Sequence, residues 1–212
     1  MKPVLTILEG KWFPDRHVSI RDLFAPLFSV WTLKGDASYH YEQFTNEAAF
    51  RAAVRYSFKG NRSDTIYVGA HGNKKEIHGF HDEGISRTFI ARSLNLEDGT
   101  ARRGLYFGAC SFCNQENADL ILRKCRRVEW IAGYDSQVDW IDSSAIDLVF
   151  LRHFLFPTPG TGNKKPTTKL ARLRYAAKRV CTDMAPLVER LGFHVYVRSG
   201  KKIEDLTAKA DG

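Results

Sequence analysis

The chain has 212 residues, of which 43% are hydrophobic and 12% aromatic, and its formal net charge is +8 at pH 7. This composition is ample for one sizeable core and marginal for two domains. No apolar run approaches the length of a membrane span, and Glu9 ends the N-terminal apolar stretch too early for a secretory signal. We therefore expect a cytoplasmic protein without a membrane partner.

The spread of charge and the number of cysteines argue against two further classes of protein. Lysines and arginines are distributed from Arg51 to Lys202 without a recognition motif, so we do not expect nucleic acid as the main partner. Four cysteines in a chain of this length do not form a disulfide framework. Cys125 and Cys181 fall in segments of helical periodicity, where cysteine commonly acts as a small buried hydrophobe.

Apolar periodicity predicts strands and helices that alternate along the chain. We expect strands at 4–8, 38–44, 65–70, 104–109, 128–133 and 193–197. Between them we expect helices at 19–32, 46–58, 86–96 and 114–125. Two more helices should follow the strand at 128–133: one at 146–156, capped by Ser143, and a long one from 169 that is bent at Pro186. Repeated strand–helix units favour an α/β fold with a mostly parallel sheet and helices on both of its faces.

A stretch rich in proline and glycine at 157–166 interrupts this pattern. We expect an α/β core at 1–156, a loop or linker at 157–168, and a C-terminal part at 169–212 that packs a helix and a strand on the core and ends in a flexible tail. The C-terminal helix is basic, which indicates either a solvated face or a docking surface for an acidic protein partner. Its basic residues are Lys169, Arg172, Arg174, Lys178 and Arg179.

Two of the predicted strands end on reactive side chains. The run from Thr65 to Ala70 is followed by His71 and Gly72, and the run from Gly104 to Ala109 is followed by Cys110. In open parallel sheets the ligand crevice lies outside the carboxyl ends of the strands. The pattern therefore predicts an imidazole and a thiol side by side where a cysteine nucleophile needs a histidine.

The sequences YVGAHG at 67–72 and YFGACS at 106–111 resemble the paired motifs of the caspase-like cysteine peptidases. This superfamily includes caspases, metacaspases, clostripain- and gingipain-type enzymes, separase and legumain. A third stretch, at 131–140, resembles the strand and substrate loop that follow the catalytic cysteine in that superfamily. It shares Asp135 and Gln137 with the metacaspase pattern and Trp140 with the caspase pattern, but Ile141 replaces the caspase arginine. The LEGxW sequence at 8–12 resembles the opening of a group of bacterial caspase-like and metacaspase-like proteins.

The resemblance, over about residues 4–156, implies a caspase-like three-layer sandwich and a cysteine endopeptidase. In that reading Cys110 is the nucleophile, His71 protonates the leaving amine, and the N–H groups of Gly72 and Cys110 hold the oxyanion. A thiol attacks only as thiolate, and the helix expected from Asn114 favours a negative charge near its N-terminus. The same fold also serves as a catalytically inactive binding or regulatory module, which is the alternative.

Carboxylates near the same sheet edge suggest a preference for basic substrates. Glu9 ends the first strand, and Asp135 and Asp139 follow the strand after the cysteine. We expect these three side chains, with Trp140, to bind a peptide or protein substrate and to select arginine or lysine at P1.

A zinc site and a redox motif are two other interpretations of the same region. Cys110 and Cys113 have the CxxC spacing, and His78 and His81 complete a Cys₂His₂ set. The buried strand before the CxxC sequence argues against both a zinc knuckle and a thioredoxin-like motif. We therefore expect neither a metal nor a cofactor.

Overall fold

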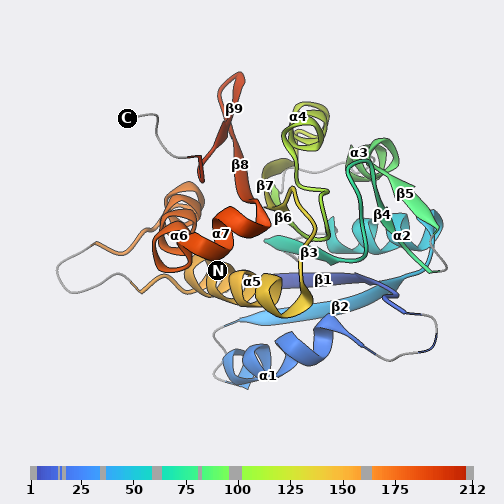
Figure 1. Ribbon diagram of the computed structural model, residues 1–212, viewed down its shortest axis with the longest axis horizontal. Coiled ribbons are helices and arrows are strands. Elements are labelled where there is room, and N and C mark those ends of the chain that lie inside the picture. The colour runs from blue at the N-terminus through green and yellow to red at the C-terminus, as the bar shows by residue number, and fades with distance from the viewer. Residues whose placement is uncertain are drawn as a thin grey trace.

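The computed structural model describes residues 4–13, 15, 18–33, 37–58, 64–80, 83–95, 102–158 and 164–208. These residues contain a sheet of seven strands in the order β2-β1-β3-β6-β7-β8-β9 (Figure 1). Its strands are β1 (Val4–Gly10), β2 (Ser38–Phe44), β3 (Thr65–Gly69), β6 (Arg103–Gly108), β7 (Val128–Tyr134), β8 (Phe193–Ser199) and β9 (Lys202–Asp205). The strands from β2 to β7 are parallel, whereas β8 and β9 are antiparallel to their neighbours.

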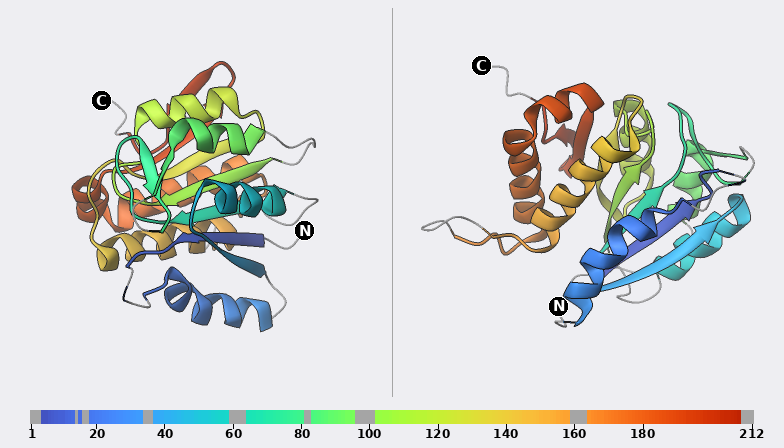
Figure 2. Two further views of the ribbon diagram at one scale, coloured as in Figure 1. Left: turned by 90° about the vertical axis from the view of Figure 1, so that its right-hand side faces the viewer. Right: turned by 60° about the horizontal axis from the view of Figure 1, so that its bottom comes forward.

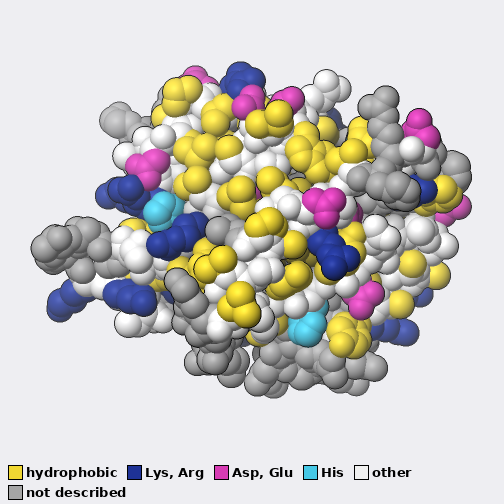
Figure 3. Space-filling view, turned by 90° about the horizontal axis from the view of Figure 1, so that it is seen from below, with side chains coloured by type: hydrophobic (Ala, Val, Ile, Leu, Met, Phe, Trp, Pro, Cys, Tyr) yellow, Lys and Arg dark blue, Asp and Glu magenta, His cyan; other side chains and the backbone are white. Residues whose placement is uncertain are grey.

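Helices cover both faces of this sheet, which confirms the predicted α/β class (Figures 1 and 2). One face carries α2 (Glu47–Phe58), α3 (Arg87–Asn95) and α4 (Gln115–Lys124). The other face carries α1 (Ile20–Leu33), α5 (Trp140–Leu155), α6 (Lys169–Asp183) and α7 (Ala185–Leu191). Seen from below, hydrophobic side chains are visible across the molecular surface (Figure 3). Among the described residues, the large hydrophobic side chains with the greatest exposure are Leu33 and Ile141.

The central strands are buried on both faces because successive side chains point to opposite sides of the sheet. Ile66 and Val68 of β3 enter the core beneath α2, α3 and α4, and Tyr67 between them enters the other core. The same alternation places Tyr106 of β6 beside Tyr67, with the two rings stacked at 5.2 Å between centroids. The buried strands β3 and β6 therefore each contribute a tyrosine hydroxyl to this core, although their sequences are apolar.

Helix α5 begins six residues earlier than expected, at Trp140, and Ser143 does not cap it. Its N-cap is Asp139, whose carboxylate accepts hydrogen bonds from the N–H groups of Ile141 and Asp142 at 2.8 and 3.0 Å. Aspartate at this position satisfies amide donors that the first helical turn leaves free. The early start places the whole N-terminal part of α5 next to the sheet edge where β3 and β6 end.

The C-terminal region also differs from the prediction. The long helix is not bent but divided at Met184 into α6 and α7, with Pro186 in the first turn of α7, where its missing N–H is not needed. Strand β9 and a small hairpin of β4 (Glu76–His78) and β5 (Gly84–Ser86) were not predicted. Within the described residues, no helix is long and apolar enough to span a membrane.

Candidate active site

Parallel pairing brings His71 and Cys110 to one edge of the sheet. Gly69, the last residue of β3, is in register with Gly108, the last residue of β6. His71 and Cys110 each follow two residues later, and both are half-buried and line one cavity of about 160 Å³. An engineered cavity of ~150 Å³ holds a benzene molecule, so this space admits a single side chain. The cavity is lined by Trp12, Phe13, Ile20, Tyr67, Ala70, His71, Gly108, Cys110, Val138, Trp140, Ser143, Ser144 and Asp147.

The imidazole of His71 is held by the segment that follows β1. Its Nε2 atom lies 2.8 Å from the carbonyl oxygen of Trp12. The rings of Trp12 and Phe13 contact the imidazole edge-on, with 5.2 and 5.5 Å between ring centroids. A carbonyl oxygen only accepts hydrogen bonds, so Nε2 carries the proton. In the neutral ring, Nδ1 is then the basic nitrogen that is available to take a proton.

The thiol of Cys110 lies on a constrained turn between β6 and α4. Its Sγ atom accepts a hydrogen bond from the N–H of Val138 at 3.5 Å and donates one to the carbonyl oxygen of the same residue at 3.8 Å. The next residue, Ser111, has φ of 58°, the single positive φ of a non-glycine residue in the described chain. The N–H of Ser111 donates to Ser136 at 2.9 Å, which fixes this unfavourable conformation.

Gly72 approaches the backbone of Cys110 closely. A Cβ atom at Gly72 would lie 3.2 Å from the carbonyl oxygen of Cys110 and 3.2 Å from Cβ of Ala109. Gly72 also pairs with Ile77 in an isolated antiparallel bridge. The hydrogen bonds of this bridge come from flanking residues, from His78 N–H to His71 and from Asn73 N–H to Glu76. The bridge therefore does not use the N–H of Gly72.

Glu9 has a structural role in place of the substrate-binding role expected from the sequence. It is 1% exposed and does not line the cavity. Its carboxylate accepts hydrogen bonds from four donors: Trp12 Nε1 at 2.6 Å, Ser19 Oγ at 2.6 Å, Ile20 N at 2.5 Å and the Tyr41 hydroxyl. Burial and the bond to Glu9 raise the pKa of Tyr41 to about 12. With both oxygens occupied, Glu9 anchors the segment that holds His71.

Asp135 and Asp139 do not converge on the cavity either. The carboxylate of Asp135 lies 3.2 Å from Nε2 of His194 and accepts the hydroxyl of Ser136 at 2.9 Å. Asp139 is exposed and caps α5 as described above. Of the residues expected to bind substrate, Trp140 alone lines the cavity. Its ring contacts that of Trp12, with 4.6 Å between the ring centroids.

Asp147 is the carboxylate that the cavity does contain, and the sequence interpretation missed it. It is 1% exposed, and its oxygens accept hydrogen bonds from the hydroxyls of Tyr67 at 2.6 Å, Tyr134 at 2.5 Å and Tyr106. Burial raises the pKa of Asp147 to about 6, and the three tyrosine hydrogen bonds oppose this increase. The signal available in the sequence was one acidic residue in the otherwise apolar helix at 146–156.

The two cysteines of the CxxC sequence lie in different environments. Cys110 lines the cavity, whereas Cys113 is buried in the core beneath α2, α3 and α4, and burial raises the pKa of its thiol well above the ordinary value. This separation argues against a shared zinc ion and against a redox pair. His81, the fourth residue of the Cys₂His₂ set, is outside the described residues, which contain no cluster suited to a metal ion.

Most basic side chains of α6 are engaged within the chain. Lys169 pairs with Glu129 at 3.1 Å, Arg174 with Glu204 at 3.3 Å and Arg179 with Asp183 at 2.6 Å, while Arg172 lies over the ring of Phe154. The fifth basic residue of the helix, Lys178, is exposed. An acidic protein partner on this helix remains a prediction.

No protein-family model and no curated protein matches this chain. The structure is similar to that of the complex of Porphyromonas gingivalis RgpB pro- and mature domains, with a TM-score of 0.57 and 12% sequence identity, over 89% of this chain and 45% of that chain. RgpB is a gingipain, a cysteine peptidase of the caspase-like superfamily. The fold is caspase-like. At 12% identity the likeness shows the fold alone, and this chain spans less than half the length of its neighbour.

Proposed function

We propose that this protein is a caspase-like cysteine endopeptidase that uses Cys110 and His71 and cleaves after arginine or lysine. The observation that carries the proposal is that the thiol, the imidazole and the buried carboxylate of Asp147 line one cavity. The imidazole and the thiol follow β3 and β6 and supply the acid–base group and the nucleophile of the reaction, while the carboxylate comes from α5 and supplies a charge for selecting the P1 side chain.

In the proposed reaction, Nδ1 of His71 accepts the thiol proton as Sγ of Cys110 attacks the carbonyl carbon of the scissile bond. The resulting oxyanion accepts hydrogen bonds from the N–H groups of Gly72 and Cys110. When the intermediate collapses, the C–N bond breaks and His71 gives its proton to the leaving amine. A water molecule, deprotonated by His71, then hydrolyses the thioester and regenerates the thiol.

The shape and polarity of the cavity support a basic P1 side chain. Its walls are formed largely by aromatic and aliphatic groups, among them Trp12, Trp140 and Val138, which suit the methylene groups of arginine or lysine. Asp147, buried among three tyrosine hydroxyls, offers the cation an opposite charge in a region of low dielectric. In this proposal Asp147 has the role in P1 selection that the sequence suggested for Glu9, Asp135 and Asp139.

The test is a panel of fluorogenic peptides with arginine, lysine, aspartate or leucine at P1, assayed on wild type, Cys110→Ala and His71→Ala. Cys181→Ala is the matched control, because Cys181 is a half-buried thiol on α6 that does not line the cavity. We expect cleavage after arginine and lysine that both active-site variants abolish and the control retains. Preference for aspartate would contradict the specificity. Binding of peptides without turnover would favour the inactive binding module.

A further inference from the structure

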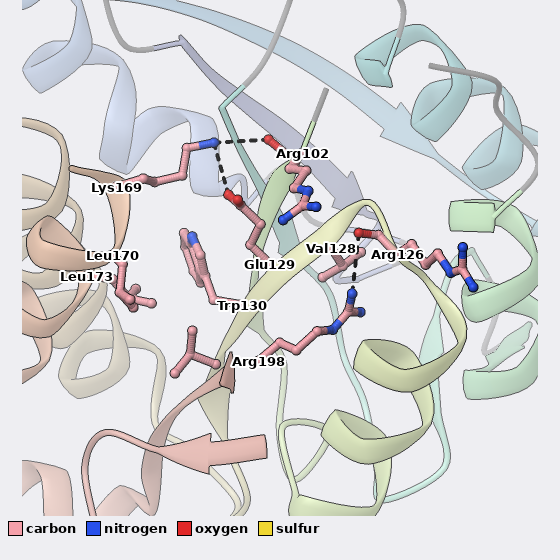
Figure 4. A pocket seen from close by; sticks show the side chains of 10 residues that line it. Arg102, Arg126, Val128, Glu129, Trp130, Lys169, Leu170, Leu173 and Arg198 are labelled. Atoms are coloured by element: carbon pink, nitrogen blue, oxygen red, sulfur yellow. Dashed lines mark hydrogen bonds and ion pairs between the residues drawn. The ribbon is translucent and has the colours of Figure 1, made fainter. Parts of the chain in front are cut away.

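A second cavity lies at the other end of β6 and β7, away from His71 and Cys110. Its volume is about 230 Å³, and it forms where these strands begin and where β8 ends, beside the first turns of α6. The residues that line it are Arg102, Arg126, Val128, Glu129, Trp130, Lys169, Leu170, Leu173, Val197 and Arg198 (Figure 4). We call it the basic pocket, because it contains four cationic side chains and one carboxylate.

The carboxylate does not neutralise this charge. Glu129 pairs with Lys169 at 3.1 Å, so the three arginines have no acidic partner lining the pocket (Figure 4). Arg198 donates to main-chain carbonyl groups, including that of Cys125 at 3.0 Å, which holds the guanidinium in place. Neither Arg102 nor Arg126 has a side-chain hydrogen bond or ion pair among the described residues, and both are exposed.

Repulsion between the arginines is a second sign of excess positive charge in the basic pocket. The pKa of Arg198 is lowered, first by burial and then by the positive charge of Arg102. An arginine guanidinium stays protonated at physiological pH, so the repulsion cannot be relieved by losing a proton. An anion placed between the arginines would relieve it.

A buried tryptophan forms part of the wall of the same cavity. The indole of Trp130 is 1% exposed, and its Nε1–H has no acceptor within the described protein. The ring lies directly against Gly104, where a Cβ atom would be 1.9 Å from it, and it packs on Phe154 at 5.0 Å between centroids. The edge of the ring that carries Nε1 is inaccessible and faces Gly104, so Trp130 forms part of the cavity wall and does not donate a hydrogen bond into the cavity.

A shallower groove of about 440 Å³ continues from the basic pocket and shares Arg126 and Arg198 with it. Arg123, Lys201 and Lys202 add three more cations there. Together, the pocket and the groove offer one enclosed position and one open position for negative charge, joined at two arginines.

We propose that the basic pocket binds a small anion carrying more than one phosphate group. Arginine guanidinium groups match phosphate oxygens in bidentate geometry, and three arginines line this pocket. Leu170, Leu173 and Val197 leave room for an apolar part of the ligand. A single-stranded nucleic acid fits less well, because such strands are bound by stacking on accessible aromatic rings, and Trp130 is buried.

The first test is calorimetric titration with sodium tripolyphosphate and, separately, with ATP, at physiological salt. We expect saturable binding of one ligand per chain. The double variant Arg102→Gln/Arg126→Gln should weaken it at least about tenfold, since each lost charge-assisted bond contributes on this scale. Both side chains are exposed, so this variant should fold. Arg92→Gln is the matched control, an exposed arginine on α3 outside the pocket that should leave affinity within about twofold.

The second test follows the indole N–H resonances of the four tryptophans by NMR. The Trp130 resonance, assigned with Trp130→Phe, should shift and saturate with the calorimetric affinity, while those of Trp12 and Trp140 should not. Absence of binding at millimolar ligand, equal losses in Arg92→Gln and the double variant, or binding of a short RNA but of neither phosphate compound would each overturn the proposal. None of these readouts requires peptidase activity.

Discussion

The Nε2 atom of His71 donates a hydrogen bond of 2.8 Å to the main-chain carbonyl oxygen of Trp12. This bond fixes the ring tautomer with a main-chain atom, and the position of that atom depends on the segment between β1 and α1. The segment is in turn held by Glu9, which accepts a hydrogen bond from the Trp12 indole and caps α1 through the N–H of Ile20. A buried carboxylate outside the cavity therefore orients the imidazole inside it.

Replacing Glu9 with glutamine should impair both stability and catalysis. Charge-assisted hydrogen bonds to a buried carboxylate contribute about 1.5–3 kcal/mol each, so we expect the free energy of unfolding to fall by about 2–4 kcal/mol in urea denaturation. Because the Trp12 carbonyl should lose its fixed position, kcat should fall about tenfold with a smaller change in KM. Glu42→Gln, an exposed change on β2, is the control. Unchanged stability would contradict the role assigned to Glu9.

Asp147→Asn should remove the preference for arginine without unfolding the protein. Losing one partner of a buried charge pair commonly costs 2–5 kcal/mol, so we expect kcat/KM for an arginine peptide to fall about 100-fold or more. Burial raises the pKa of Asp147 to about 6, so its ionisation costs stability as pH rises through that value. The variant avoids this cost but weakens the hydrogen bonds from three tyrosine hydroxyls, so its free energy of unfolding at pH 8 should stay within about 2 kcal/mol of that of wild type in urea denaturation.

Two control variants make this prediction specific. Asp135→Asn and Asp139→Asn change the carboxylates that the sequence favoured and that lie outside the cavity. Asparagine also caps helices well, so α5 should keep its N-terminus in Asp139→Asn. If either control loses arginine cleavage as fully as Asp147→Asn does, the assignment of the specificity residue is wrong.

Selection of arginine should weaken in acid. Asp147 is anionic above its pKa of about 6 and neutral below it, so its attraction for a guanidinium should be lost as pH falls through that value. The measurement is the ratio of kcat/KM for peptides with arginine and with citrulline, a neutral analogue, at P1. Because both peptides use the same thiol and imidazole, the ratio of their kcat/KM values reports on the ionisation of Asp147. A ratio that is constant from pH 5 to pH 8 would exclude Asp147 as the partner.

The backbone at Ser111 predicts an unusual response to substitution. Its φ of 58° is unfavourable for residues with a Cβ atom, and glycine adopts it without strain. Ser111→Gly should therefore leave the free energy of unfolding unchanged or raise it by up to about 1 kcal/mol. Ser111→Val should lower it by more than 1 kcal/mol on the same scale. The reverse order in urea denaturation would contradict the role assigned to the positive φ of this residue.

The sequence predicted the α/β architecture and the juxtaposition of His71 and Cys110 because both depend on local pattern. Strands β3 and β6 are apolar runs with clear ends, and parallel pairing determines that residues at their carboxyl ends meet. The local pattern alone therefore predicts that His71 and Cys110 lie close together.

The carboxylate that lines the cavity could not be found in the same way. Whether Glu9, Asp139 or Asp147 faces the cavity depends on where α5 begins and on which donors surround each acid. Asp139 follows a strand closely, but it is used in capping α5. Asp147 lies in a helix, and its neighbours Tyr67, Tyr106 and Tyr134 come from three separate strands. Long-range packing of this kind leaves no local pattern in the chain.

The central claim is that Cys110, His71 and Asp147 act on one substrate residue, and covalent labelling tests it most directly. The protein is treated with a peptidyl-arginine chloromethyl ketone, and the rate and position of the adduct are followed by intact and peptide mass spectrometry. We predict a single adduct on Cys110 that forms rapidly in wild type and slowly in His71→Ala and Asp147→Asn. Labelling on Cys181, or labelling of Cys110 at the same rate in all three proteins, would contradict the proposed active site.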